Sequence, residues 1–503
     1  MSGFAISFSD SDAGAVNAMM EKIPHRGNYM QNICTKGRAV LGQNYLQADT
    51  RGAKPDAAIP VTDGDLTICY DGQINDCREL GRQFSIKDGP FLEERLLLHL
   101  YRNHRDELFQ YLKNAIFSFV ISDGKTLFAA RDLLGIKTMF YSKQNNRLLI
   151  ASELKCLTAV TDDIREFPAG CVMDENDAAA SFDKLSAQVE LWDKDIDALT
   201  ADIRAMIEKQ IRRAVDFDSP TGGLLSGGMD SSVINAISSQ IYQEKFGDGE
   251  KLKTFSIGVG ESGDIQNARL MADFIGSEHH EIFVTLDDLL KAIPDVIYYL
   301  ENFDPSLVRS SVANYLISSY AAKEHGIQVL LSGEGGDEIF CGYTYLKQAP
   351  YDQMTQKQLE CLEFLHNNAS LRLDRMNQCN SIKVVAPLIS GELLDYALRI
   401  PPQLKQKQDG DTRIEKWIFR KAYEGILPAE IIWRTKQEFS QGSGSAGVLP
   451  QHFEKTVTDS DFSAMQQKFP IIRSKEECFY FKLFTEYFGE GKAVETVGQW
   501  ISL

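Results

Sequence analysis

The sequence has 503 residues, 43% hydrophobic and 25% charged, a composition typical of globular proteins, and its length predicts two or three domains. Its formal net charge of −18, without a basic run, argues against nucleic acid or anionic membranes as partners. We expect a cytoplasmic protein with reduced thiols, because no long apolar run or signal peptide is visible and the nine cysteines form no C-x-x-C pair.

Residues 1–190 are predicted to form a β-rich domain. Short apolar segments, several of them alternating, are separated by turn signals such as Asp-Gly and Asn-Asn. These segments are residues 4–9, 65–74, 115–123, 126–132, 138–143 and 148–153. Apolar residues at helical spacing predict helices over Ser11–Glu21 and Phe91–Asn103. This pattern is typical of a layered antiparallel domain.

The pattern changes near residue 190, where an acidic stretch leads into an amphipathic helix ending near Ala214. We place a domain boundary there and expect a second domain over 191–503. Apolar strands then alternate with helices, which predicts a parallel sheet covered on both faces. The expected strands are 222–225, 253–259, 279–284 and 328–333, with a helix over 265–276. After about residue 350 the sequence is predicted to be mostly helical.

The stretch LLSGGMDSSV (224–233) predicts the end of a buried strand, a glycine turn and the start of a helix. Such a turn gathers backbone N–H groups at a helix N-terminus, where a phosphate chain can bind. Gly227 and Gly228 allow close approach, and Ser226, Ser231 and Ser232 add hydroxyl donors. Asp230 is placed to hold Mg²⁺ beside the phosphates. The alternative is an ordinary Gly-Ser turn between a strand and a helix.

A second glycine-rich loop, LSGEGGDEIFCGY (331–343), immediately follows the strand segment QVL (328–330). Ligands of open parallel sheets bind at the carboxyl ends of the strands, so both loops should face one crevice. Asp337 is a second candidate metal ligand, and Glu334 is a candidate proton acceptor. The alternative is that these carboxylates only stabilise the start of a helix through its dipole.

The chain resembles the asparagine synthetase family in its glutamine-dependent, two-domain form, which includes the β-lactam synthetases. The matching stretches are HRGNYM (25–30), DGQINDCREL (71–80), RDLLGIKTMFYS (131–142), ASELKCL (151–157), LLSGGMDSS (224–232), TFSIGV (254–259), LSGEGGDEIFCGY (331–343), LRLDRM (371–376), EKWIFRKAYEGILP (415–428) and WRTKQEFSQGSG (433–444). The resemblance implies an α/β protein: an Ntn-hydrolase-like αββα glutaminase-type domain, followed by an adenine-nucleotide α-hydrolase-like synthetase domain. It also implies that Mg-ATP adenylates a carboxylate, which a nitrogen nucleophile then attacks.

Carried over by this resemblance, the synthetase motifs are largely complete. Asp230 and Asp337 match the Mg²⁺ ligands, Lys436 matches the lysine that contacts the phosphates and the adenylate, and Glu334 matches the asparagine synthetase glutamate rather than a β-lactam synthetase tyrosine. Positions implied at ATP or pyrophosphate are Leu225, Ser226, Gly227, Gly228, Asp230, Ser231, Ser232, Ile257, Gly333 and Lys416. Arg309 also lies in a matching segment, and we assign it weakly to the substrate.

The N-terminal motifs depart from the family where the glutaminase chemistry should lie. Ser2 stands in place of the nucleophilic cysteine, Tyr45 in place of the glutamine-binding arginine, and Asp71 in place of the oxyanion-site asparagine. The aspartate expected to bind the glutamine amine aligns with Phe91 or Leu92. We therefore expect an inactive, structural glutaminase-like domain.

A further departure lies at 383–390, where asparagine synthetases show E-A-R-V-P-F-L-D and this chain has K-V-V-A-P-L-I-S. If this stretch lines the acceptor-acid pocket, Lys383 and Val385 change the charges in that pocket, and the site would bind a different acid. The alternative is that a structural corner has been repacked.

Together these observations predict an AMP-forming amide ligase that uses ATP and Mg²⁺ and joins a small carboxylate to an amine that its own glutaminase does not supply. The amine could belong to the same substrate, to a second molecule or be free ammonia, and a specialised-metabolite role fits the lost glutaminase. Alternatives are an ammonia-dependent asparagine synthetase, a peptide-cyclising ligase and a catalytically silent scaffold. A homodimer is a further expectation that the sequence leaves open.

Overall fold

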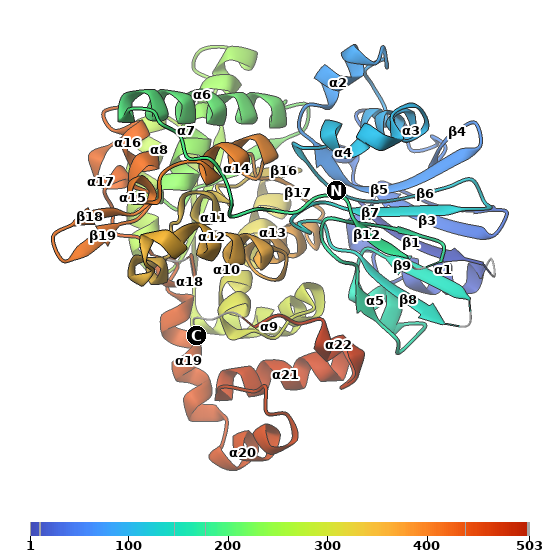
Figure 1. Ribbon diagram of the computed structural model, residues 1–503. Coiled ribbons are helices and arrows are strands. Elements are labelled where there is room, and N and C mark those ends of the chain that lie inside the picture. The colour runs from blue at the N-terminus through green and yellow to red at the C-terminus, as the bar shows by residue number, and fades with distance from the viewer. Residues whose placement is uncertain (1, 10–11, 145, 177, 438, 500–503) are drawn as a thin grey trace.

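The computed structural model describes residues 2–9, 12–144, 146–176, 178–437 and 439–499. Figure 1 shows a β-sandwich on one side and a parallel sheet surrounded by helices on the other. The predicted combination of a layered αββα part and a parallel-sheet part is confirmed. None of the helices formed by these residues is both long and apolar enough to cross a membrane.

The N-terminal sandwich consists of two six-stranded antiparallel sheets. The first has the order β10 (Arg165–Glu166), β8 (Phe140–Gln144), β9 (Arg147–Ala151), β1 (Gly3–Phe8), β3 (Ala39–Tyr45), β2 (Met30–Lys36). The second has the order β12 (Ala179–Ser181), β11 (Cys171–Asp174), β7 (Leu127–Arg131), β6 (Ala115–Ser122), β5 (Leu66–Ile74), β4 (Val61–Asp63). All six segments predicted as strands contribute to these sheets. The prediction missed the other six strands of these sheets, and in two of them, β2 and β3, polar residues interrupt the apolar pattern.

The two sheets pack face to face through side chains such as Phe4, Ile6 and Val120, which strand alternation directs inward. α1 (Ala13–Met20) and α5 (Leu154–Thr158) cover one outer face, and α2 (Cys77–Gln83), α3 (Leu92–Asn103) and α4 (Leu108–Tyr111) lie on the other side. Asp12 caps α1 by accepting from the nitrogen of Ala15, and the predicted start at Ser11 lies outside the described residues.

The parallel sheet has the order β15 (Glu278–Val284), β14 (Lys253–Val259), β13 (Thr221–Leu224), β16 (Val329–Leu331), β17 (Lys383–Val385). Strands β13 to β16 were predicted, whereas β17 was not. β17 is three residues long and pairs with β16 at the edge of the sheet, within a region expected to be helical. Leu330 and Leu331 point to opposite faces and join different hydrophobic clusters, so the sheet is covered on both sides.

One face is covered by helices that include α6 (Ile196–Ala214), α7 (Met229–Phe246), α8 (Gly263–Ile275), α11 (Gly336–Phe340), α14 (Gly391–Leu398) and α16 (Trp417–Tyr423). The other face carries α9 (Leu286–Leu300), α10 (Pro305–His325), α13 (Ala369–Gln378), α19 (Ser445–Thr456) and α21 (Lys475–Phe488). The remaining elements lie at the periphery: α12 (Met354–Glu363), α15 (Pro402–Lys405), β18 (Lys407–Asp409), β19 (Thr412–Ile414), α17 (Ala429–Ile432), α18 (Phe439–Gly442), α20 (Asp459–Lys468) and α22 (Lys492–Glu495).

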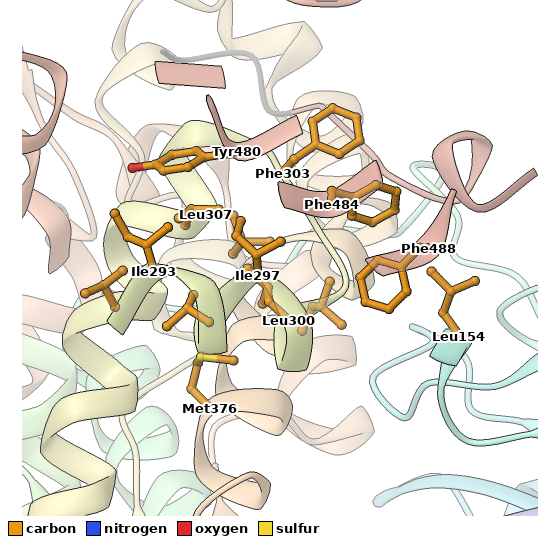
Figure 2. Packing of buried hydrophobic residues seen from close by; sticks show 14 of the residues in the cluster. Leu154, Ile293, Ile297, Leu300, Phe303, Leu307, Met376, Tyr480, Phe484 and Phe488 are labelled. Atoms are coloured by element: carbon orange, nitrogen blue, oxygen red, sulfur yellow. The ribbon is translucent and has the colours of Figure 1, made fainter. Parts of the chain in front are cut away.

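Figure 2 shows the core between α9 and α21. Ile293, Ile297 and Leu300 lie on one side of α9, facing Phe484 and Phe488. Leu154 of the N-terminal sandwich belongs to the same cluster. The two parts of the chain therefore share a continuous hydrophobic core.

Candidate active site

Strand β13 carries a glycine-rich loop to the start of α7. Gly227 has a φ of +65°, which glycine adopts without the steric cost of a Cβ. Gly228 caps α7, whose first backbone N–H groups have no partner within the helix. The Oγ atoms of Ser226 and Ser231 lie 3.2 Å apart across the loop. The loop thus gathers N–H and hydroxyl donors at one point, as an oxyanion site requires.

The loop after β16 lies directly against this first loop, because β13 and β16 are hydrogen-bonded neighbours. A Cβ on Gly333 would lie 2.5 Å from the nitrogen of Ser231, and a Cβ on Gly336 would lie 2.4 Å from Oδ1 of Asp230. Only glycine permits so close an approach at these two positions. The prediction that the two loops share one crevice is confirmed.

Two lysines join the carboxylates of these loops. Nζ of Lys416 contacts Asp230 and lies 2.7 Å from Oδ1 of Asp337, while Nζ of Lys436 lies 2.6 Å from Oδ2 of Asp337. Lys416 is 2% exposed and has a φ of +55°, a strained value for a residue with a Cβ. Such strain persists only where the surrounding contacts hold the side chain in place.

The carboxylates and the lysine cations of this cluster stabilise one another in their charged forms. Burial alone would raise the pKa of Asp337, but the Lys416 and Lys436 cations outweigh burial and hold that pKa well below its usual range. Burial would lower the pKa of Lys436, and the Asp337 and Asp230 carboxylates reverse this and raise it. Both groups are therefore charged at neutral pH.

The cluster lines a cavity of about 210 Å³. Most of the predicted site residues reach it: Leu225, Ser226, Gly228, Asp230, Ser231, Ile257, Gly333, Glu334, Asp337, Lys416 and Lys436. Gly227 and Ser232 belong to the same loop without lining the cavity, since Gly227 packs against Asn267 and Ser232 is fully buried. Tertiary structure thus brings together residues that are up to about 200 positions apart in the chain.

The cavity-lining residues that were not predicted include Arg372 and Arg434. Arg372 of α13 makes an ion pair with Glu334, and Arg434 donates to the carbonyl of Ser226 at 3.2 Å and to Asp264 at 2.6 Å. Both arginines lie in matching stretches, 371–376 and 433–444, so the motifs contained the signal. The motifs did not indicate which residue each arginine side chain contacts.

Three predicted substrate residues do not reach the cavity. Nε of Arg309 is bonded to both oxygens of Glu476 at 3.0 Å, so Arg309 joins α10 to α21. Lys383 lies 3.2 Å from Asp49 of the N-terminal sandwich, and Val385 is buried in the sheet. The structure therefore places none of the three residues at the cavity: Lys383 and Val385 belong to the edge strand β17 beside the N-terminal sandwich, and Arg309 lies on α10.

Ser390, at the end of the same stretch, caps α14 by accepting from Leu393, and its Oγ lies 3.1 Å from Oδ1 of Asn114 in the N-terminal sandwich. The alternative interpretation of 383–390, a repacked structural corner, agrees with these contacts.

Ser2 lies in a second, much smaller pocket. Its nitrogen donates to Oδ1 of Asp71 at 3.1 Å and its hydroxyl donates to the carbonyl of Tyr70 at 2.5 Å. Asp71 also accepts from Nη1 of Arg26 at 3.0 Å and lies 3.5 Å from Nζ of Lys137. The serine hydroxyl and the carboxylate are therefore both occupied by internal contacts.

Arg26 and Lys137 extend these contacts into a buried ion network that reaches the parallel-sheet domain. Lys137 lies 2.7 Å from Asp374, and Arg375 lies 2.8 Å from Glu301. The members are the cations Arg26, Lys137, Lys155 and Arg375 and the carboxylates Asp71, Glu153, Glu301 and Asp374. The formal charges balance, as a group of buried ions requires.

The space around Ser2 is almost filled. Its cavity has a volume of about 10 Å³, room for about one water molecule. Tyr45 is 1% exposed, Lys383 enters from β17 to pair with Asp49, and Nη2 of Arg51 lies 3.4 Å from Oε1 of Glu93. Side chains from both parts of the chain therefore close this pocket.

Glu93 lines this pocket one or two positions after the residues aligned with the missing aspartate, Phe91 and Leu92. Its Oε2 accepts from the hydroxyl of Tyr70 at 2.6 Å and from the nitrogen of Ile74 at 3.0 Å. The pocket thus contains an acidic side chain, Glu93, that the motif comparison did not identify. Its carboxylate accepts hydrogen bonds from other groups of the protein.

Glu338 is buried between the cavity and the N-terminal sandwich. Its Oε1 accepts from the hydroxyl of Tyr343, which lines the cavity. Burial, and secondly the charges of Glu334 and Asp337, raise the pKa of Glu338 to about 7.

The free energy of unfolding should therefore fall as pH rises from about 4.5 to about 7, because the native state holds a proton that the unfolded state has released. Glu338→Gln should remove this component, which is at most about 3 kcal/mol. Urea unfolding at pH 5 and pH 8 measures the change, with the exposed Glu363→Gln as the matched control. Equal pH dependence in wild type and Glu338→Gln would contradict the assignment.

A glycine-rich loop at a helix N-terminus, two carboxylates and two lysines at the carboxyl ends of parallel strands define a nucleotide-dependent synthetase site. Residues 202–360 and 348–493 match the family model described as asparagine synthase, and residues 1–184 match that of a glutamine amidotransferase domain. The chain belongs to the asparagine synthetase family. It is an ATP-using carbon–nitrogen ligase of the AMP-forming type.

Curated relatives are similar in sequence to this chain along nearly its whole length. Asparagine synthetase [glutamine-hydrolyzing] 1 of Saccharomyces cerevisiae is 31% identical over 536 residues, covering 96% of this chain and 92% of the relative. Asparagine synthetase B [glutamine-hydrolyzing] of Escherichia coli is 30% identical over 501 residues, covering 94% and 88%.

Proposed function

We propose that this ligase adenylates a small-molecule carboxylate with Mg-ATP and couples it to an amine or ammonia that its own N-terminal sandwich does not generate. In this proposal residues 1–190 form a structural domain and residues 191–503 form the catalytic domain. The observation that carries the proposal is the contrast in volume between the cavity of about 210 Å³ at the glycine-rich loops and the space of about 10 Å³ around Ser2.

The residues at the large cavity fit a nucleotide and Mg²⁺. Among the described residues, Oδ1 of Asp230 is buried and has no hydrogen-bond partner, so it can bind a cation. Asp230 and Asp337 would hold Mg²⁺, which would neutralise the phosphates when bound. Lys416 already places one positive charge between these carboxylates.

In the first step, a carboxylate oxygen of the acid attacks the α-phosphorus of ATP, and pyrophosphate leaves. The N–H groups of the 226–231 loop and Lys436 are placed to stabilise the charge that develops on the phosphates. In the second step, the amine nitrogen attacks the acyl carbon, the nitrogen loses a proton and AMP leaves. Glu334, held by Arg372 at the rim of the same cavity, would take that proton.

Loss of glutamine hydrolysis is supported by three features around Ser2. Its hydroxyl donates to a main-chain carbonyl, Tyr45 fills the place expected for a carboxylate-binding arginine, and Asp71 is paired with Arg26. Each feature removes a contact that bound glutamine or its oxyanion would need. A role in specialised metabolism is part of the proposal and rests on this loss alone.

A second candidate is an ammonia-dependent asparagine synthetase. It is favoured by Glu334 and by the position of the 383–390 stretch away from the cavity, since the changes in that stretch no longer argue against aspartate. ATP–pyrophosphate exchange over a panel of acids, with ammonium and with candidate amines, separates the two candidates. Aspartate as the best acid favours the second, and no exchange with any acid favours a silent scaffold.

Incubation with glutamine should release no glutamate above the uncatalysed rate, because the pocket around Ser2 has no room for this substrate. Glutamate is measured by chromatography in the presence and absence of ATP, with Ser2→Ala as the matched control. Glutaminase turnover in wild type that Ser2→Ala abolishes would overturn the proposal that the sandwich is inactive.

A further inference from the structure

A cluster of metal-ligating side chains lies at the opposite end of the sheet from the catalytic loops. Glu278 and His280 stand at the start of β15, and His325 is the last residue of α10. One ligand atom of each residue lies within 4.8 Å of the others. Oε1 of Glu278 and Nε2 of His280 are 3.1 Å apart, and the rings of His280 and His325 are 3.9 Å apart.

His325 contains an unsatisfied polar atom within this cluster. Among the described residues, its Nε2 is shielded from solvent and makes no hydrogen bond. A shielded ring nitrogen without a partner destabilises the fold unless a ligand completes it.

We propose that Glu278, His280 and His325 bind one divalent transition-metal ion, with Zn²⁺ the best match and water as the fourth ligand. Two imidazoles and one carboxylate suit zinc, whereas Mg²⁺ and Ca²⁺ prefer oxygen ligands alone. Ligand atoms around tetrahedral zinc are about 3.3 Å apart for bonds of about 2.0 Å. The separation between Glu278 and His280 already meets this requirement, and His325 needs to close a gap of 4.8 Å or less.

Lys253 is a neighbouring cation that competes with the ion. Nζ of Lys253 lies 3.9 Å from Oε1 of Glu278, and both side chains are partly exposed. An exposed pair at that distance is weak, so a divalent ion can displace it. His279, the neighbour of His280, points to the other face of the sheet, where it contacts Thr254 and Ser256. It therefore takes no part in the cluster.

Because of the position of this site, a bound ion would connect two elements of the fold that lie close to the catalytic cavity. It would join the end of α10 to β15, and α10 also contributes Ser306, Ser310 and Asn314 to the catalytic cavity. The rings of His280 and His325 each lie 5.3 Å from that of Phe255, a residue that lines the same cavity. Zinc would therefore fix the elements directly behind the cavity.

Titration of the full-length protein with ZnSO₄ by calorimetry, and with CoCl₂ by visible absorption, tests the site. We expect one saturable zinc site and a cobalt spectrum of a four-coordinate ion with nitrogen ligands. His280→Ala and His325→Ala should each weaken zinc binding at least about tenfold and remove the cobalt bands. The matched controls Glu281→Gln, on the same strand but paired with Arg269, and His452→Ala should bind as wild type does.

Circular dichroism checks that the histidine variants fold. If either histidine variant fails to fold, zinc binding and the cobalt bands are measured on Glu278→Gln instead. The side chain of Glu278 is 48% exposed and tolerates replacement. Unchanged zinc affinity and cobalt bands in a folded His280→Ala/His325→Ala double variant would overturn the proposal. Absence of saturable zinc binding to wild type would do the same.

Discussion

Asp230→Asn and Asp337→Asn should each reduce ATP–pyrophosphate exchange by about a hundredfold or more. Each substitution keeps the shape of the side chain and removes a negative charge from the pair that would hold Mg²⁺. It also removes a negative charge that pairs with Lys416, which is buried, or with Lys436, which is partly buried. The loss should therefore exceed that of a single hydrogen bond.

The measurement is exchange of labelled pyrophosphate into ATP with the best acid from the panel, over a range of Mg²⁺ concentrations. Asp273→Asn, an exposed aspartate on α8, is the matched control and should retain wild-type exchange. Partial rescue of Asp230→Asn by raised Mg²⁺ would indicate weakened metal binding. Exchange near the wild-type rate in both variants at low Mg²⁺ would exclude the proposed metal site.

Glu334→Gln should lower amide formation by about 10²- to 10⁴-fold while pyrophosphate exchange survives. The attacking amine must lose a proton as it forms the tetrahedral species, and glutamine cannot accept one. Adenylation precedes this step and requires no base. The carboxylate of Glu334 faces the cavity and is held by Arg372, so the substitution removes the base while retaining the size of the side chain.

Both reactions are followed on the same enzyme preparation, amide by mass spectrometry and exchange by radioactivity. Glu363→Gln on α12 is the control, because this glutamate is exposed and distant from the cavity lining. Equal loss of both reactions would assign Glu334 to binding of ATP, metal or acid instead of proton transfer. Arg372→Lys provides a further comparison, since lysine keeps the charge but loses the planar arginine group.

Local sequence patterns were sufficient for much of the fold. Short apolar segments bounded by turn signals located β5, β6 and β7 in the sandwich, and apolar segments that alternate with helices located β14 and β16 in the parallel sheet. The glycine-rich loops at 226–232 and 332–337 were recognised because their chemistry requires those residues next to one another. Asp230, Glu334 and Asp337 were therefore assigned to one crevice before their positions were known.

The sequence by itself thus determined the layered antiparallel and parallel-sheet classes of the two parts and the positions of the glycine-rich loops, because each signal comes from residues close together in the chain. Tertiary structure alone decided the partners of isolated side chains. It placed Lys383 beside Asp49, Arg309 beside Glu476 and Arg372 beside Glu334. These pairs join segments 38 to 334 residues apart. The physical reason is that a long charged side chain can satisfy its charge against any element that folding brings within a few ångströms, and no local pattern specifies which element that is.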